Sequence, residues 1–122
     1  MKRRALAYAR VRVDGDPSVI DEEIKDRINR QFSACIEEID RIGAQMVDFC
    51  VDVQESARNL GRPGLKDLLR RTTSLGAVDL VVVTSIDRFA RTTADLERLR
   101  KALRESDVEL HVGGQPLQEV AT

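Results

Sequence analysis

Arginine residues are concentrated at the ends of segments whose hydrophobic pattern is typical of β-strands. Arg10 and Arg12 close the first of these segments, and Arg88 and Arg91 follow a nearly all-apolar run. Arg62 precedes a helix-forming stretch that begins with proline. A guanidinium group stays charged at any physiological pH and binds phosphate oxygens in pairs through its planar fork. Several guanidinium groups aimed at one point would form an anion site suited to phosphate.

The charge of the whole chain requires such a site to be local. The sequence has 20 lysine and arginine residues and 21 aspartate and glutamate residues, a formal net charge of -1. A charge this small exerts no long-range attraction on a nucleic-acid backbone. Any one arginine at a strand end is most often simply solvated, and Asp87 could serve only as an ion-pair partner. The inference of a phosphate site therefore rests on the group of arginines.

Four segments have the pattern of β-strands. The run at 78–84 is nearly all apolar, which is typical of a strand that is buried on both faces of a parallel sheet. In the segment at 4–13 the side chains alternate, so Arg10 and Arg12 are predicted to lie on the same face. The other two predicted strands span 44–51 and 108–112.

Three helices are predicted between these strands. Apolar residues recur at three- and four-residue steps from Ile20 to Ile42, and Gly43 follows as the expected stop. We expect Asp16 to cap this helix, with Pro17 at its first position. The second helix is predicted from Pro63 to Gly76, with Leu65, Leu68, Leu69 and Leu75 on its apolar face, and the third is capped by Thr92 or Thr93 and carries Leu96, Leu99 and Leu103.

The alternation of strands and helices predicts an α/β fold with a mainly parallel central sheet of about four or five strands and flanking helices, in three layers. In such sheets the carboxyl ends of the strands meet at one edge, so the arginines are expected to converge there. We expect a single domain over residues 1–122. Residues 52–62 are predicted to form an exposed, mobile loop, and residues 113–122 a short tail.

The cysteine and histidine content argues against a metal site. Cys35 and Cys50 are interpreted as buried thiols in a reducing compartment, and His111 as a surface or edge-strand residue. No cysteine pair stands at ligand spacing, so a structural zinc site is not expected. No apolar run approaches the roughly 18 residues that a membrane span needs. We expect a cytoplasmic protein that does not bind membranes.

Other small phosphate-handling folds fit the sequence less well. Neither of the common glycine-rich phosphate loops is present. A response-regulator receiver would need an acidic pair after the first strand, which Asp14 and Asp16 imitate. It would also need an aspartate at the end of the third strand, but the run at 78–84 ends in Thr84, and no lysine closes the strand at 108–112. The receiver hypothesis is therefore disfavoured.

Three motifs together resemble a known family. The first is Tyr-Ala-Arg-Val-Arg at 8–12, similar to Tyr-x-Arg-Val-Ser, and the second is Arg-Pro-Gly-Leu at 62–65. The third is Ile-Asp-Arg-Phe-Ala-Arg at 86–91, similar to Leu-Asp-Arg-Leu-x-Arg. Their order and approximate spacing, across nearly the whole chain, resemble the catalytic domain of the serine recombinases, the resolvase/invertase family.

The resemblance implies a role for each of these charged residues. In the family a serine attacks a DNA phosphodiester and holds the cut 5′ end as a phosphoserine ester, without a metal or nucleotide cofactor. Only the protein can then neutralise the charge that develops on the phosphoryl oxygens. By resemblance this phosphate-binding role belongs to Arg10, Arg62, Arg88 and Arg91. Asp87 would orient one of them and could assist the leaving oxygen.

The sequence also departs from the family at the most important position. The family's serine falls at Arg12, on the same face as Arg10, and a permanently protonated guanidinium cannot attack phosphorus. The family's glutamines after the serine are missing, and Asp14-Gly15-Asp16 brings negative charge there instead. Ser18 is better explained as part of the helix start. We therefore predict a domain that cannot cleave DNA.

The expected partners follow from the same resemblance. Family chains continue into a long dimerising helix and a DNA-binding module, and we expect neither after the strand at 108–112, where Pro116 follows closely. Binding to the DNA phosphate backbone should be weak, and a homo-oligomer or a full-length recombinase is a possible partner. Two alternatives stay open: an enzyme rescued by another nucleophile or by a longer parent chain, and a non-enzymatic protein-interaction or regulatory module.

Overall fold

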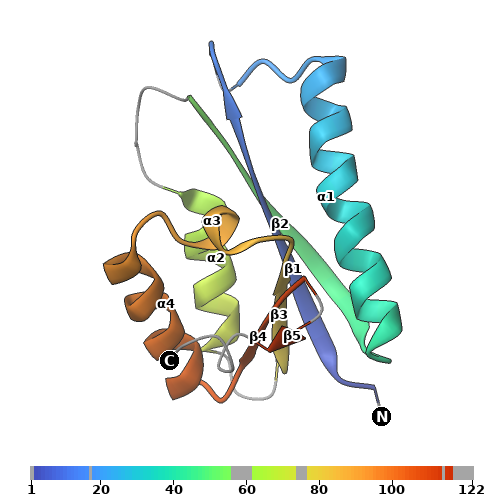
Figure 1. The fold of residues 1–122 in the computed structure, drawn as a ribbon, viewed down its shortest axis with the longest axis vertical. Coiled ribbons are helices and arrows are strands. Elements are labelled where there is room, and N and C mark those ends of the chain that lie inside the picture. Colours follow the sequence, from blue (N-terminus) through green and yellow to red (C-terminus); the bar gives the residue numbers. More distant parts are fainter. Residues whose placement is uncertain (1, 17, 56–61, 74–76, 114, 117–122) are drawn as a thin grey trace.

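The computed structural model describes residues 2–16, 18–55, 62–73, 77–113 and 115–116. Within them the chain forms a central sheet with the strand order β2-β1-β3-β4-β5 (Figure 1). β1 to β4 are parallel, and β5 pairs antiparallel with β4. The predicted mainly parallel sheet is thus confirmed. The strands are β1 (Arg4–Val13), β2 (Gln45–Glu55), β3 (Leu80–Val83), β4 (Glu109–Val112) and β5 (Gln115–Pro116).

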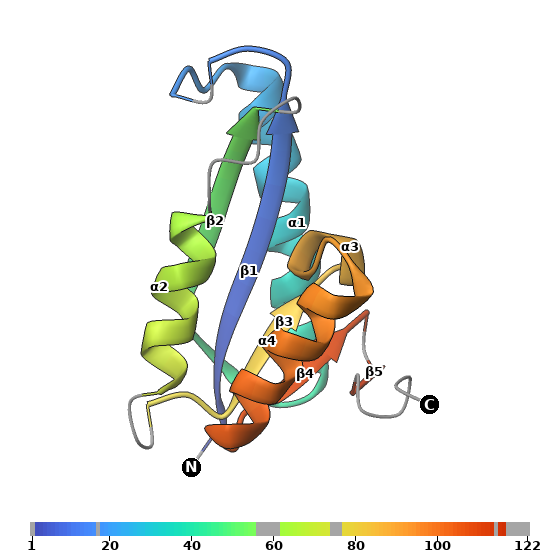
Figure 2. The same cartoon turned by 90° about the vertical axis from the view of Figure 1, so that its left-hand side faces the viewer.

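Helices cover both faces of this sheet, as the three-layer prediction requires. α1 (Glu22–Arg41) lies on one face, and α2 (Pro63–Thr72) and α4 (Thr93–Glu105) lie on the other (Figures 1 and 2). The short helix α3 (Ile86–Phe89) directly follows β3 and packs against β1. Right-handed crossovers between parallel strands account for this division of the helices between the two faces.

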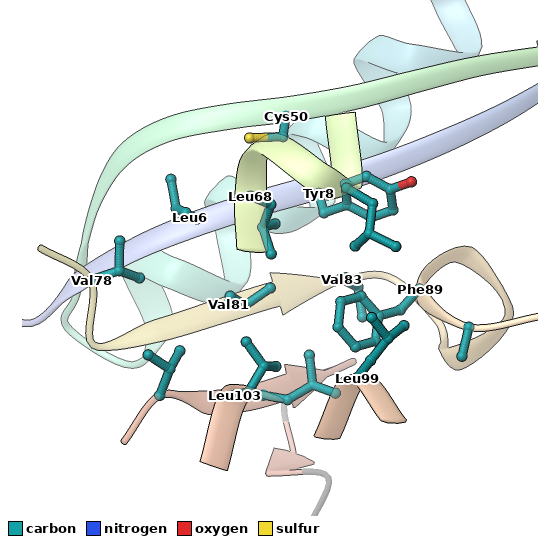
Figure 3. Packing of buried hydrophobic residues seen from close by; sticks show 14 residues of the cluster. Leu6, Tyr8, Cys50, Leu68, Val78, Val81, Val83, Phe89, Leu99 and Leu103 are labelled. Carbon is teal, nitrogen blue, oxygen red and sulfur yellow. The ribbon is translucent and has the colours of Figure 1, made fainter. Parts of the chain in front are cut away.

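β1 is the centre of the core, and its two faces carry different side chains. Leu6 and Tyr8 point to the α2–α4 side, where they belong to the same buried cluster as Leu68 and Phe89 (Figure 3). On the opposite face, small side chains such as Ala7 allow α1 to approach the sheet closely, and a second buried cluster forms there. The alternation predicted for residues 4–13 is confirmed.

β1 is longer than the strand beside it. It pairs with β2 along its whole length but with β3 only from Ala5 to Ala7. Beyond that point β1 has no strand on the β3 side among the described residues, and Gln31 of α1 forms hydrogen bonds with its backbone there. The side chain of Gln31 accepts a hydrogen bond from the Arg10 backbone N–H (3.3 Å) and donates one to the Arg10 carbonyl (3.0 Å). The carboxyl end of β1 therefore extends past its pairing with β3, and Gln31 holds it in place on that side.

The start of α1 corrects the predicted cap. Asp21, not Asp16, is the N-cap, and its carboxylate accepts a hydrogen bond from the Ile24 N–H (2.9 Å). Asp16 instead accepts hydrogen bonds from the backbone N–H and the hydroxyl of Ser18, which lower the pKa of Asp16. Ser18 therefore lies in the connection before the helix and not in its first turn. Pro17 lies outside the described residues, whereas Gly43 follows the helix with φ +75 as expected.

The second strand and the second helix also differ from the sequence expectation. β2 continues to Glu55, so Asp52 lies in a buried strand and not in an exposed loop. Residues 56–61 of the predicted loop lie outside the described residues. The helix α2 ends at Thr72, and Leu75 and Gly76 of the predicted helix are outside the described part as well.

The segments after β3 hold two further corrections. Helix α3 forms one turn at residues 86–89, between the strand predicted at 78–84 and the helix predicted to be capped by Thr92 or Thr93, where the sequence analysis predicts no helix. β5 occupies part of the predicted tail and pairs Pro116 with His111. His111 is consequently buried and not a surface or edge residue.

Both cysteines are buried thiols, as predicted. Cys35 lies on the buried face of α1, Cys50 lies in β2 and packs in the cluster that includes α2, and neither forms a disulfide. Burial raises the pKa of each thiol to about 11. Both thiols are thus protonated at neutral pH, which makes them poor nucleophiles. No helix among the described residues combines the length and apolarity needed to cross a membrane.

Candidate phosphate-binding site

Several of the arginines predicted to act together lie where the strand order of the sheet reverses. The chain leaves β1 toward β2 on one side and leaves β3 toward β4 on the other, so the carboxyl ends of β1 and β3 form a topological switch point. Ligands of open α/β sheets bind at this kind of crevice. Arg10 and Arg12 come from the end of β1, and Asp87 and Arg88 come from α3 after β3.

Arg10 and Arg88 bind one another's backbone. The buried guanidinium of Arg10 donates hydrogen bonds to the carbonyls of Arg88 (3.3 Å) and Asp87. Arg88 donates one of its own to the carbonyl of Arg10 (3.1 Å). This reciprocal pair fastens α3 to the part of β1 that extends beyond its pairing with β3.

The positive charges of three other arginines act on Arg10. The pKa of Arg10 is lowered chiefly by burial, and further by the positive charges of Arg62, Arg12 and Arg91. Like charges this close to one another repel, so an anion bound between them would relieve the repulsion. Arg10, Arg62 and Arg88 are thus joined through hydrogen bonds to the backbone, and the charges of Arg12 and Arg91 act on Arg10.

Arg62 is buried, and its guanidinium group donates hydrogen bonds to acceptors within the protein. Its Nη2 donates to the Phe89 carbonyl (2.7 Å), the Arg88 carbonyl (3.0 Å) and the Tyr8 hydroxyl (3.1 Å). Its Nη1 lies 3.5 Å from an Asp95 carboxylate oxygen. The guanidinium carbon also lies 5.5 Å from the centre of the Tyr8 ring, within cation–π range. Arg62 thus joins β1, α3 and α4 from its position before α2.

Asp52 is the member of this network that the sequence analysis missed. Its carboxylate, only 2% exposed, accepts hydrogen bonds from the Tyr8 hydroxyl (2.6 Å), the Gly64 N–H (2.6 Å) and the Leu65 N–H (3.0 Å). Arg62 stands at the N-cap of α2 without a side-chain cap bond, and Asp52 supplies that acceptor from β2. Burial and the Asp52 hydrogen bond raise the pKa of Tyr8, so the phenol stays protonated.

The Arg-Pro-Gly-Leu motif has a local structural explanation. Pro63 occupies the first turn of α2, where its missing N–H costs nothing. A Cβ atom on Gly64 would lie 2.6 Å from the Val51 carbonyl oxygen, so only glycine allows this approach to β2. Leu65 enters the core beside Tyr8. The motif thus allows α2 to pack closely against β2 and positions Arg62 in the site.

Three arginines of the group remain accessible to a ligand. Arg12 and Arg91 are exposed and Arg88 is half-buried. Arg12 lies two residues beyond Arg10 in β1 and pairs in register with Gln54 of β2. Asp87 is exposed, and the pKa of its carboxyl group is lowered by a hydrogen bond from Ser85 and by the charges of Arg88 and Arg10. The accessible part of the site is therefore cationic, with the carboxylate of Asp87 at its edge.

The fold and this cluster define a class: an α/β domain with cations gathered at the switch point of a parallel sheet. The particular family follows from the sequence. Residues 5–120 match the model of the resolvase family, described as the resolvase N-terminal domain. The chain belongs to the resolvase family, and it is a serine recombinase catalytic domain.

Solved structures support this assignment. The C-terminal catalytic domain of ISC1926 TnpA, an IS607-like serine recombinase, is 25% identical with a TM-score of 0.71, covering 90% of this chain and 67% of that one. A serine recombinase from Sulfolobus solfataricus is 26% identical with a TM-score of 0.66, covering 93% and 70%. A resolvase family site-specific recombinase from Streptococcus pneumoniae shares the fold, with a TM-score of 0.76 at 20% identity, covering 97% and 78%. No curated protein matches the chain.

Proposed function

We propose that this domain binds the phosphate backbone of DNA and does not cleave it. The observation that supports this most directly is Arg12, which is exposed beside Arg10 at the carboxyl end of β1. By resemblance to the family, this is the position of the nucleophilic serine. A guanidinium at that position adds a phosphate ligand and removes the attacking oxygen.

Cleavage by a serine recombinase needs a hydroxyl whose oxygen forms a bond to phosphorus as the bond to the leaving oxygen breaks. Arg12 has no lone pair to donate at any physiological pH. Ser18 lies further along the chain, and its hydroxyl donates to Asp16 (2.8 Å). Asp14 and Asp16 also place negative charge after β1, which would repel a phosphodiester.

The arginines divide between two proposed roles. Arg10 and Arg62 are buried and act as positioning residues, because their guanidinium groups bind the carbonyls of α3. Arg12, Arg88 and Arg91 are the proposed phosphate ligands. Asp87 would hold Arg88 in place and limit how much negative charge the site accepts. No cofactor is needed for this function.

The biological setting is proposed from the same family membership. The unit over residues 1–122 would act in the cytoplasm, by weak contact with DNA or by association with its own copies or with a full-length recombinase. A second candidate, a protein-interaction or regulatory module, is favoured by one observation. Arg10 and Arg62 donate hydrogen bonds to backbone carbonyls inside the protein, so the fold would use them even in a domain without any role on DNA.

DNA binding should be weak and strongly dependent on salt. Nonspecific contacts of this kind give dissociation constants of about 10⁻⁴ to 10⁻⁶ M at physiological salt, and each phosphate contact adds about -0.9 to the slope of log affinity against log salt. Replacing Arg88 and Arg91 by alanine should therefore reduce the magnitude of the slope by about 1.8, for every duplex sequence alike. Fluorescence anisotropy at about 50 and 200 mM salt measures this.

A double alanine variant of Lys101 and Arg104 is the matched control. These two residues lie in the last turns of α4, whereas Arg91 immediately precedes its first turn, and both are exposed. The control should retain the parent slope. If the folded protein does not bind DNA at any salt concentration, the result would favour the protein-interaction module. Tight, sequence-selective binding would contradict the proposal.

A further inference from the structure

A groove between α2 and α4 extends the cationic surface away from the switch point. The groove has a volume of about 460 Å³, and we call it the α2–α4 groove. Its lining includes the exposed side chains of Lys66 from α2 and Arg98 from α4, which we call its walls, and the less exposed Leu65 and Leu69, which we call its floor. Arg91 lies at its edge and is shared with the arginine cluster, because the charge of Arg91 also acts on Arg10.

The charges in the α2–α4 groove are not balanced. Four cationic side chains line it, and Asp95 is its one carboxylate among the described residues. Asp95 is already engaged by Arg98 (2.5 Å) and by Arg62 (3.5 Å). Lys66 and the guanidinium of Arg91 have no ion pair within the described ranges and are available to an anion. Arg98 uses Nη2 toward Asp95, but its side chain is 70% exposed, so its other N–H groups can also reach an anion.

Both helices begin at this groove. The first turn of α2 carries Leu65 and Lys66, and the first turn of α4 carries Asp95 after the Thr92 cap. The first N–H groups of both helices already have acceptors in the protein, because Asp52 accepts from Gly64 and Leu65 and Thr92 accepts from Asp95, so the positive charge of the groove comes from its side chains. The apolar floor would accommodate the sugar of a nucleotide, while the cations at the walls would reach its phosphates.

We propose that the α2–α4 groove binds the sugar–phosphate backbone of the DNA strand where it leaves the arginine cluster, through Lys66 and Arg98. This inference rests on the proposed function, because it identifies where a bound strand continues beyond the first phosphate. The groove adds two phosphate ligands that lie outside the three family motifs. A single strand fits best, since its backbone can bend into the space between two helices.

The test compares two double variants with equal loss of charge. Lys66→Gln with Arg98→Gln removes the groove cations, and Lys101→Gln with Arg104→Gln removes two exposed cations from the other end of α4. Binding of fluorescein-labelled oligothymidylate is measured by anisotropy at several salt concentrations. For the groove variant we expect the slope of log affinity against log salt to shrink by about 1.4, and affinity to fall more than about ten-fold at 50 mM salt. The control should stay at the parent values.

The outcomes separate this inference from the proposed function. Equal losses in both variants would mean a general charge effect and would overturn the groove assignment. Unchanged binding by the groove variant, while variants of Arg12 and Arg88 lose affinity, would overturn the groove assignment and leave the proposed function standing. An absence of binding by the parent protein would overturn both. Unfolding midpoints of all variants establish that the fold is intact.

Discussion

Replacing Arg62 by alanine is expected to lower the free energy of unfolding by about 3 kcal/mol or more. The side chain is only 8% exposed and donates to the Phe89 carbonyl, the Arg88 carbonyl and the Tyr8 hydroxyl. Removing one partner from a buried charged network typically costs about 3 to 5 kcal/mol, because the remaining groups lose their hydrogen bonds without regaining water. Urea denaturation followed by circular dichroism measures the change.

Arg91→Ala is the control for this prediction. Arg91 is exposed, and its side chain has no hydrogen bond or ion pair among the described residues, so we expect a change within about 0.5 kcal/mol. Arg62→Lys should not restore stability, since a single ammonium cannot reach three acceptors in the planar arrangement of a guanidinium. An Arg62→Ala protein as stable as its parent would show that Arg62 is free for ligands and not a positioning residue.

The second large effect is expected at Gly64. A Cβ atom there would lie 2.6 Å from the Val51 carbonyl oxygen and 2.9 Å from the Val51 carbonyl carbon. These are backbone atoms of a paired strand and cannot rotate away. Gly64→Ala must therefore push α2 off β2 or break the hydrogen bond from the Gly64 N–H to Asp52, and overpacking of this kind costs about 1 to 3 kcal/mol.

Gly15→Ala provides the comparison, since a Cβ atom at Gly15 would have nothing within 4 Å. Its effect on the denaturation midpoint should be small, whereas Gly64→Ala should lower the midpoint clearly. Equal midpoints for the two variants would mean that α2 is not held against β2 in the way that the Arg-Pro-Gly-Leu motif indicates.

Much of the framework could be predicted from side-chain periodicity. The apolar run that contains β3 and the alternation in β1 gave the parallel sheet and the shared face of Arg10 and Arg12. Convergence of the arginines followed from a general property of parallel sheets, whose strands end at one edge. Periodicity indicates which face of an element a side chain occupies. Together with the position of each strand end, it was enough to predict that these arginines lie near one another.

The burial of Arg10 and Arg62 could not be predicted in this way. It depends on β1 being longer than β3, which leaves a gap that α3 fills and carbonyl groups that need donors. Strand length relative to a neighbour is a tertiary property that one segment of sequence does not contain. Both residues were therefore expected among the phosphate ligands, whereas their donors are occupied by the backbone of α3.

Asp52 was missed for a different reason. Its neighbours Val51 and Val53 continue the strand, but the polar stretch after them suggested that the loop began at Asp52. A buried carboxylate is favourable here because two backbone N–H groups of α2 and the Tyr8 hydroxyl all donate to it. The apolar residues on either side of Asp52 were the available signal that β2 had not yet ended.

The most direct test of the proposed function is an assay for covalent attachment to DNA. The protein is incubated with supercoiled and with nicked DNA, denatured, and analysed for protein that remains attached to a DNA end. We predict no phosphoserine adduct, because Arg12 stands where the attacking serine is expected, and we predict that Arg12→Ser alone does not give efficient cleavage, since Asp14 and Asp16 remain beside the site. An adduct of the parent protein that survives denaturation and maps to Ser18 or to any other residue would contradict this prediction.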